Sequence, residues 1–123
     1  MLPGFVEITP NINEREIELA KQIANNINRK CIGKENAVSN KRLREAFMKA
    51  SGEKISDVRM RRMINYIRGW NLVSRLCACH AGYFQAETQE EWDKWKLSMK
   101  KRINEMQRIL DCASFFSDQQ EKL

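Results

Sequence analysis

Residues 1–12 form a leader in which apolar residues have no regular spacing. After residue 12 the apolar residues recur at regular intervals. Asn13, with Glu16 three residues later, has the form of a capping box that opens a helix. The residues that then recur at helical spacing are Ile17, Ala20, Ile23, Ala24 and Ile27. The pattern predicts a first helix over about 14–29.

Two shorter amphipathic segments follow a connector over 29–38. Ser39 is a suitable cap for a second helix, whose inward residues we expect to be Leu43, Ala46 and Phe47, and Gly52 permits a left-handed exit. Ser56 is a suitable cap for a third helix over 56–69. Its apolar residues share one face: Met60, Met63, Ile64 and Ile67.

The last third of the chain predicts a β-hairpin and a long helix. Apolar runs over 72–78 and 83–86 flank a turn that contains Gly82, so we expect a hairpin over 72–86. Thr88 and Glu91 have capping-box spacing and open a helix over about 89–113, with a flexible tail over 114–123. The order is typical of a winged helix-turn-helix domain over 13–113, mainly α with a small β-hairpin wing and a long C-terminal helix.

Composition agrees with a single helical domain. The chain has 123 residues, of which 42% are hydrophobic and 31% charged, and Gly and Pro are few. No apolar run approaches the roughly 20 residues of a membrane span, and the first residues do not resemble a signal peptide. We therefore expect a cytoplasmic protein with reduced cysteines and no membrane partner.

Positive charge is concentrated in the middle of the chain. The whole chain has a net charge of +6, but residues 40–80 hold ten basic and three acidic residues, while the rest is nearly balanced. Seven of the ten basic residues are Arg, whose planar fork suits phosphate and guanine edges. Such a segment favours a polyanion as partner, although a solvated basic face without a ligand has the same charge pattern.

Three stretches between Gly33 and Ala86 form a specific combination: Gly33-Lys34-Glu35-Asn36-Ala37-Val38-Ser39, Ile55-Ser56 followed by residues 60–68, and Gly82-Tyr83-Phe84-Gln85-Ala86. Together they resemble a family of small winged helix-turn-helix proteins found largely in phages and prophages. This chain departs from the family at Met60, where relatives have a β-branched residue, and at Trp70, where they have Gly. The resemblance implies DNA binding in transcriptional regulation or replication.

A helix that reads DNA presents its first turns to the major groove. On the third helix we expect Arg59 and Arg62 to contact base edges, and Arg61 to contact a base or a phosphate. Val58 would contact a thymine methyl or serve close packing. Basic residues of the second helix would contact the DNA backbone, and two residues of the hairpin could reach a minor groove or a phosphate. The complete predicted set is Ser56, Asp57, Val58, Arg59, Arg61, Arg62, Asn65, Lys41, Arg42, Arg44, Arg75 and His80.

Other chemistries have little support in the sequence. Cys77, Cys79 and His80 lie close together, but a structural zinc site usually needs a second spaced pair, so we predict no metal. The single His, the scattered glycines and the absence of grouped carboxylates predict neither an enzyme, a cofactor nor a small-molecule substrate.

Two questions stay open at this level. The apolar steps of three and four along the C-terminal helix suit either a seam between two copies, giving a homodimer, or a cover for the chain's own first helix and hairpin. A winged helix can also bind another protein with the surface that would bind DNA. The alternative to a DNA-binding regulator is therefore a protein-interaction adaptor, such as an antirepressor or a replisome accessory protein.

Overall fold

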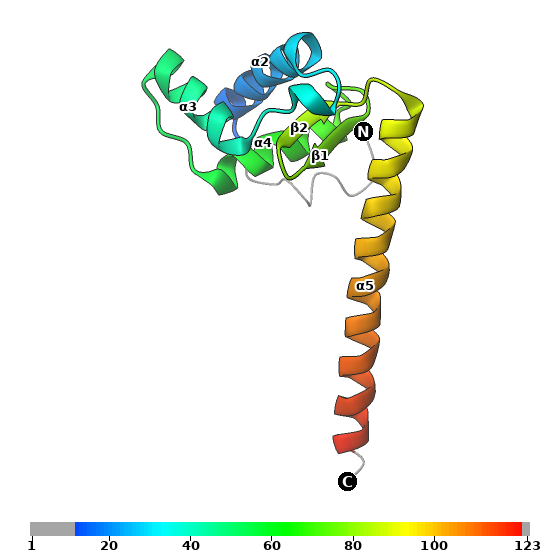
Figure 1. Ribbon diagram of the computed structural model, residues 1–123. Coiled ribbons are helices and arrows are strands. Elements are labelled where there is room, and N and C mark those ends of the chain that lie inside the picture. Colours follow the sequence, from blue (N-terminus) through cyan, green and yellow to red (C-terminus); the bar gives the residue numbers. More distant parts are fainter. Residues whose placement is uncertain (1–11, 122–123) are drawn as a thin grey trace. The chain divides into compact units, whose positions relative to one another are not determined.

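The computed structural model describes residues 12–121, so the predicted leader lies almost entirely outside the described residues. Figure 1 shows helices α2 (Glu14–Lys30), α3 (Asn40–Ser51) and α4 (Asp57–Gly69), a hairpin of β1 (Leu76–Cys79) and β2 (Gly82–Gln85), and the long helix α5 (Gln89–Glu121). A 3-10 turn, η1 (Lys34–Asn36), lies in the connector between α2 and α3. The predicted fold class, a mainly helical winged helix-turn-helix, is confirmed.

The chain divides into two units, Met1–Trp92 and Asp93–Leu123, and the division falls inside the predicted domain over 13–113. The first unit holds the helix-turn-helix and the hairpin. The second consists of α5 from Asp93 onward. Helix α5 continues to Glu121, so the predicted end near residue 113 is wrong and most of the predicted tail is helical.

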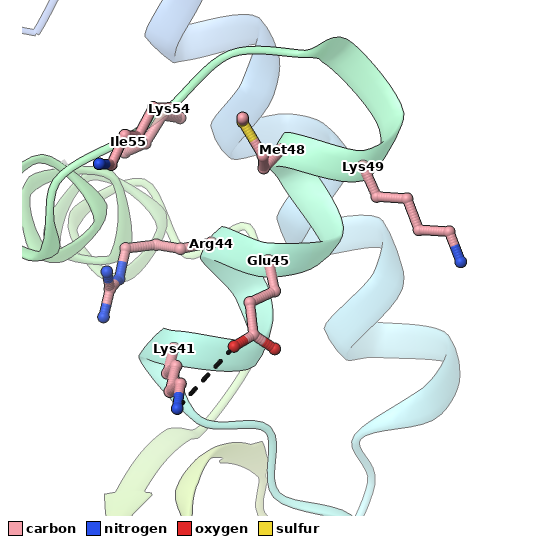
Figure 2. A pocket seen from close by; sticks show the side chains of 7 residues that line it. All are labelled: Lys41, Arg44, Glu45, Met48, Lys49, Lys54 and Ile55. Carbon is pink, nitrogen blue, oxygen red and sulfur yellow. Dashed lines mark ion pairs between the residues drawn. The ribbon is translucent and has the colours of Figure 1, made fainter.

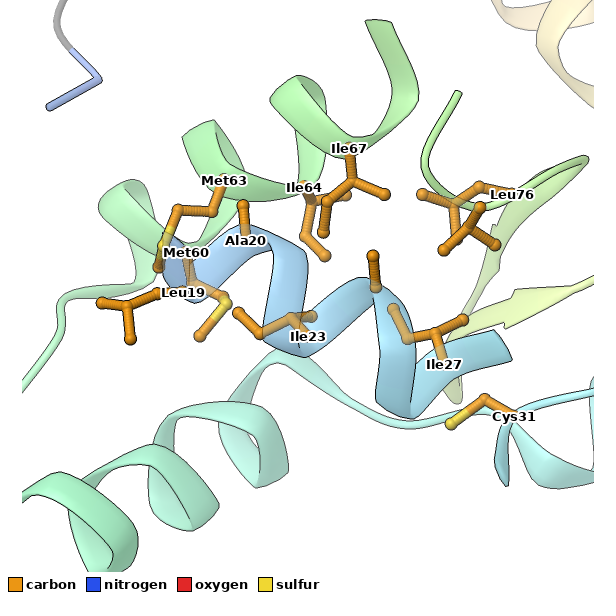
Figure 3. Close-up of a cluster of buried hydrophobic side chains, with 12 residues drawn as sticks. Leu19, Ala20, Ile23, Ile27, Cys31, Met60, Met63, Ile64, Ile67 and Leu76 are labelled. Carbon is orange, nitrogen blue, oxygen red and sulfur yellow. The ribbon is translucent and has the colours of Figure 1, made fainter. Parts of the chain in front are cut away.

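The core of the first unit lies between α2 and α4. Helix α2 begins with the predicted capping box, in which the Glu16 amide donates to Asn13 Oδ1 at 2.8 Å and the Asn13 amide donates to Glu16 Oε1 at 3.3 Å. Figure 3 shows its apolar face packed against α4, with Leu76 of the hairpin at one end. The predicted stripe of α4 is confirmed: Met60, Met63, Ile64 and Ile67 are almost wholly buried.

The two helices of the helix-turn-helix have the predicted caps. Ser39 Oγ accepts a hydrogen bond from the Arg42 amide, and Ser56 Oγ accepts one from the Arg59 amide. Gly52 ends α3 in the left-handed region, with φ of 74°. Of the three residues predicted to face inward from α3, Leu43 and Phe47 are half-buried against the core, whereas Ala46 is exposed.

The wing includes a third segment that the sequence pattern does not predict. Strands β1 and β2 pair antiparallel, with Cys77 opposite Phe84. On its other edge β2 pairs with the connector, through single bridges from Ile32 to Gln85 and from Val38 to Tyr83. The Val38 and Tyr83 backbones exchange two hydrogen bonds of 2.9 and 2.8 Å, which attach the wing to the residues just before α3.

The pairing of Val38 with Tyr83 requires glycine at position 82. Its φ is 128°, and a Cβ added there would lie 2.1 Å from the carbonyl oxygen of Val38. The hairpin also begins later than predicted, because residues 71–75 form turns in which Asn71 and Arg75 have φ near +54° and +53°. The start of strand β1 is therefore Leu76 rather than residue 72.

Candidate nucleic-acid interface

Helix α4 has an outward face directly opposite its buried stripe. At helical spacing, Val58, Arg62 and Asn65 lie on the side away from Met60 and Ile67. Val58 is 57% exposed, and Arg62 and Asn65 are partly exposed. The structure thus brings together three of the predicted site residues on one side of the second helix of a helix-turn-helix.

Arg59 does not lie on that face. Its Nη1 atom lies 3.3 Å from both carboxylate oxygens of Glu16, and the Glu16 side chain is only 9% exposed. A buried carboxylate needs such a partner, because an unpaired charge in the interior is costly. Arg59 is therefore engaged between α4 and α2, and its assignment to a base edge stays a prediction.

The start of α4 is held by a network that includes other predicted site residues. Arg61 Nη2 pairs with Asp57 Oδ2 at 3.0 Å, one turn apart on the helix. The Asp57 carbonyl accepts a hydrogen bond from the side-chain amide of Asn40 at 3.5 Å. Asn40 Oδ1 in turn accepts one from Arg44 Nε at 2.7 Å, so Ser56 as cap and Asp57 as ion-pair partner already have structural roles.

Basic side chains also surround a hollow beside α3, shown in Figure 2. The hollow has a volume of about 500 Å³ and lies between α3 and the segment that leads into α4. Lys41 pairs loosely with Glu45 at 4.0 Å, and Arg42 is exposed outside the hollow. The residues that line it are Lys41, Arg44, Glu45, Met48, Lys49, Lys54 and Ile55.

The remaining predicted residues lie on the wing. Arg75 precedes β1 with a positive φ and is exposed, and its carbonyl accepts a hydrogen bond from the Ala86 amide at 3.1 Å. His80 is exposed in the turn between the strands. Arg68, by contrast, is largely buried, and this burial lowers the pKa of its guanidinium below the ordinary value. The basic segment is therefore less available as a surface than its sequence indicates.

The cysteines give no sign of a shared site. Cys31 and Cys77 are buried, Cys79 is half-buried and Cys112 is exposed, and all four are free thiols. Burial raises the pKa of Cys77 to about 11. Within residues 12–121, the structure gathers no group of three or more His, Cys, Asp or Glu side chains suited to a metal ion.

A second exposed feature lies on α5. We call its apolar face the α5 stripe: Trp95, Met99, Ile103, Met106, Ile109, Leu110, Ala113 and Phe116. The large side chains from Ile103 to Phe116 in this stripe are 58–69% exposed. Monomeric proteins rarely expose a contiguous apolar patch of this extent, so the stripe is a candidate interaction surface. In the described part of the chain, no helix is both long and apolar enough to cross a membrane.

Comparison with family models, with curated proteins and with solved structures gave no match to this chain. The resemblance to winged helix-turn-helix proteins of phages and prophages thus rests on the residues quoted above. The functional interpretation depends on the geometry of α3, α4 and the wing.

Proposed function

We propose that this protein binds double-stranded DNA, with α4 in the major groove and the hairpin as the wing. The observation that carries the proposal is the two-sided character of α4. Its inner stripe is buried against α2, while Val58, Arg62 and Asn65 are presented outward from a helix-turn-helix framework. The resemblance to phage and prophage proteins favours a role in transcriptional regulation or replication.

The outward residues suit base edges. An Arg fork matches the O6 and N7 acceptors of guanine, and an Asn amide matches the N6 and N7 pattern of adenine. Arg62 and Asn65 supply these two groups one turn apart, and Val58 supplies an apolar contact for a thymine methyl. We assign Arg61 to a phosphate, because its pairing with Asp57 at 3.0 Å leaves it 68% exposed at the edge of this face.

The residues of α3 suit the DNA backbone. Lys41 and Arg42 lie in the first turns of α3, and the amide of Asn40 joins that end of the helix to the first residue of α4. Basic side chains beside a recognition helix fix its register on phosphates without reading sequence. Lys49 and Lys54, which line the hollow of Figure 2, extend the same positive surface.

Replacement of Arg62 by Ala tests the proposal. We expect affinity for a duplex site selected from a random pool to fall about 5- to 150-fold, about 1–3 kcal/mol, because Arg62 contacts a base edge, and affinity for a random-sequence 30-base-pair duplex to fall much less. Fluorescence anisotropy at several salt concentrations measures this loss. Arg29→Ala is the matched control, since it removes the same charge from the exposed end of α2 and should change affinity little. Equal affinity of Arg62→Ala and the native chain would exclude α4 as the reading helix.

A protein-interaction adaptor is the second candidate. It gains support from the arginines that are engaged within the fold, namely Arg59 in an ion pair and Arg68 by burial. The two candidates differ in salt dependence. Several phosphate contacts give a steep linear fall of log affinity with log salt, whereas an apolar protein interface responds weakly.

The α5 stripe bears on the DNA site as well. If it joins two copies of the chain in a homodimer, the preferred DNA should contain two related half-sites, as two-fold helix-turn-helix proteins require. A monomer would prefer a single unrepeated site.

A further inference from the structure

We propose that α5 pairs with α5 of a second copy of this chain, and that the two helices run antiparallel. The inference concerns the second unit of the chain and does not depend on DNA binding. It rests on three properties of α5: the α5 stripe, the exposure of that stripe, and the distribution of charge along the helix.

The α5 stripe has the form of a helix-pairing seam. Its residues follow one another at steps of three, four or one from Trp95 to Phe116, which keeps them on one side of the helix over about six turns. Leu97 and Phe115 lie on the other side. Such a repeat allows two helices to interlock their side chains along their length.

The stripe is uncovered from Ile103 to Phe116, since every residue from Lys100 to Ser117 is exposed, whereas Trp95 and Met99 are half-buried. Most helices in water are stabilised by packing of an apolar face rather than by their own hydrogen bonds. A 33-residue helix with large exposed side chains such as Met106 and Ile109 therefore gains stability when a partner covers that face.

The charges favour a second copy of α5 in the opposite direction. Residues 93–102 hold five basic residues and one acidic residue, whereas residues 109–118 hold two acidic residues and no basic one. In an antiparallel pair centred between Glu105 and Met106, these two segments lie side by side. In a parallel pair each basic segment would lie beside its own copy, which is unfavourable.

Arg102 sharpens this argument because it lies among the residues of the stripe. In the antiparallel register, Arg102 is opposite Ile109 of the second copy, within one turn of that copy's Glu105, which supplies a carboxylate. In a parallel register the two Arg102 side chains would meet each other across the seam. One helix therefore contains both the apolar seam and the complementary charges that an antiparallel pair needs.

Sedimentation equilibrium of the full chain without DNA tests the pairing. We expect a dimer at micromolar concentration, and we expect Leu110→Lys to raise the dimer dissociation constant about a hundredfold, because it places a charge in the seam. Leu97→Lys is the matched control: Leu97 is 53% exposed and Leu110 58%, but Leu97 lies opposite the seam, so this variant should remain dimeric. A native chain that stays monomeric at high micromolar concentration, or equal effects of both variants, would overturn the proposal.

Distances between spin labels test the direction. Labels are attached at Lys94→Cys or Gln107→Cys in a chain that also carries Cys79→Ser and Cys112→Ser, which remove the accessible native thiols. In the antiparallel pair the two Lys94 positions are about 35 Å apart along the axis, from the helical rise of 1.5 Å per residue. In a parallel pair they would be within about 20 Å.

Gln107 is the control for this measurement because it lies next to the centre of the pair and beside the seam rather than opposite it. Labels there should be close in either direction, so a short distance at position 107 shows that the helices are paired. A short distance at position 94 as well would overturn the antiparallel arrangement. Because these measurements contain no DNA, their failure would leave the proposed function of α4 standing, and failure of Arg62→Ala would leave the pairing standing.

Discussion

Helices α4 and α5 have apolar stripes of the same spacing, but the two stripes differ completely in exposure. On α4, Met60, Met63, Ile64 and Ile67 are at most 2% exposed, whereas on α5 the large residues from Ile103 to Phe116 are 58–69% exposed. Spacing alone identifies a face that must be covered and does not identify what covers it. For α4 the cover is α2 of the same chain, and for α5 we propose a second chain.

This comparison predicts that equivalent truncations have unequal costs. Ile67→Ala should destabilise the first unit by about 2–5 kcal/mol, because it leaves a cavity in a closely packed core. Ile109→Ala, at a concentration low enough to keep the chain monomeric, should cost less than about 0.5 kcal/mol, as exposed positions usually do. Urea unfolding, followed through the amide signals of α2 and α4, measures both. Similar losses for both variants would show that α5 is part of the same folding unit.

A second large effect should come from the wing. Gly82→Ala combines a positive φ, which costs about 1–3 kcal/mol for a residue with a side chain, with a Cβ placed 2.1 Å from the Val38 carbonyl oxygen. We expect the bridge between Val38 and Tyr83 to open and the melting temperature to fall. Amide hydrogen exchange at these two residues reports the opening directly. Gly52→Ala is the control, because the left-handed φ is present there without a close neighbour.

The first unit and α5 also show which parts of the fold the sequence can predict. Caps at Asn13, Ser39 and Ser56 were predictable because each depends on residues only three positions apart. The bridge from the connector to β2 was not, because Val38 pairs with Tyr83 as a single residue without the alternating pattern of a strand. The end of α5 was missed because the apolar steps were followed only to Ala113, although Phe116 continues the same face three residues later.

The candidate site was predictable only where it depends on residues close together in the sequence. The periodicity of α4 identifies Val58, Arg62 and Asn65 as outward residues. It does not distinguish Arg59, because the carboxylate that engages this side chain belongs to Glu16, 43 residues earlier in the chain. One signal was available: Glu16 falls on the same helix face as Ala20, Ile23 and Ile27, so a buried acidic residue was in need of a basic partner.

Two substitutions distinguish the side of α4 that contacts α2 from its outward side. Arg59→Ala should destabilise the first unit by about 1–2 kcal/mol, since it leaves Glu16 buried without its partner, while the partial exposure of Arg59 limits the loss. Glu16→Gln in the same chain should restore part of the stability, because the buried charge is gone. Arg62→Ala should leave stability unchanged and affect DNA binding alone. A loss of DNA affinity in Arg59→Ala that exceeds the loss in Arg62→Ala, at a temperature where both are folded, would reverse our assignment.

The smallest effect we predict concerns the cysteines of the two regions. Cys112 on α5 is exposed, whereas Cys77 is buried and its pKa is raised to about 11. Since the thiolate is the reactive form, an alkylating reagent at pH 8 should modify Cys112 within the time in which Cys77 stays unmodified. Mass spectrometry of tryptic peptides measures the two rates. Rapid modification of Cys77 in the folded chain would contradict the burial of this strand.

The Cys77 thiol makes the free energy of unfolding decrease at high pH. Burial by the fold raises the pKa of Cys77 from 9.0 to about 11, so the folded chain holds a proton that the unfolded chain releases. The contribution of the neutral thiol is therefore complete below pH 9 and is lost as the pH rises from 9 to about 11. The urea midpoint of the native chain should fall over this interval more steeply than that of Cys77→Ala, which has no thiol to ionise.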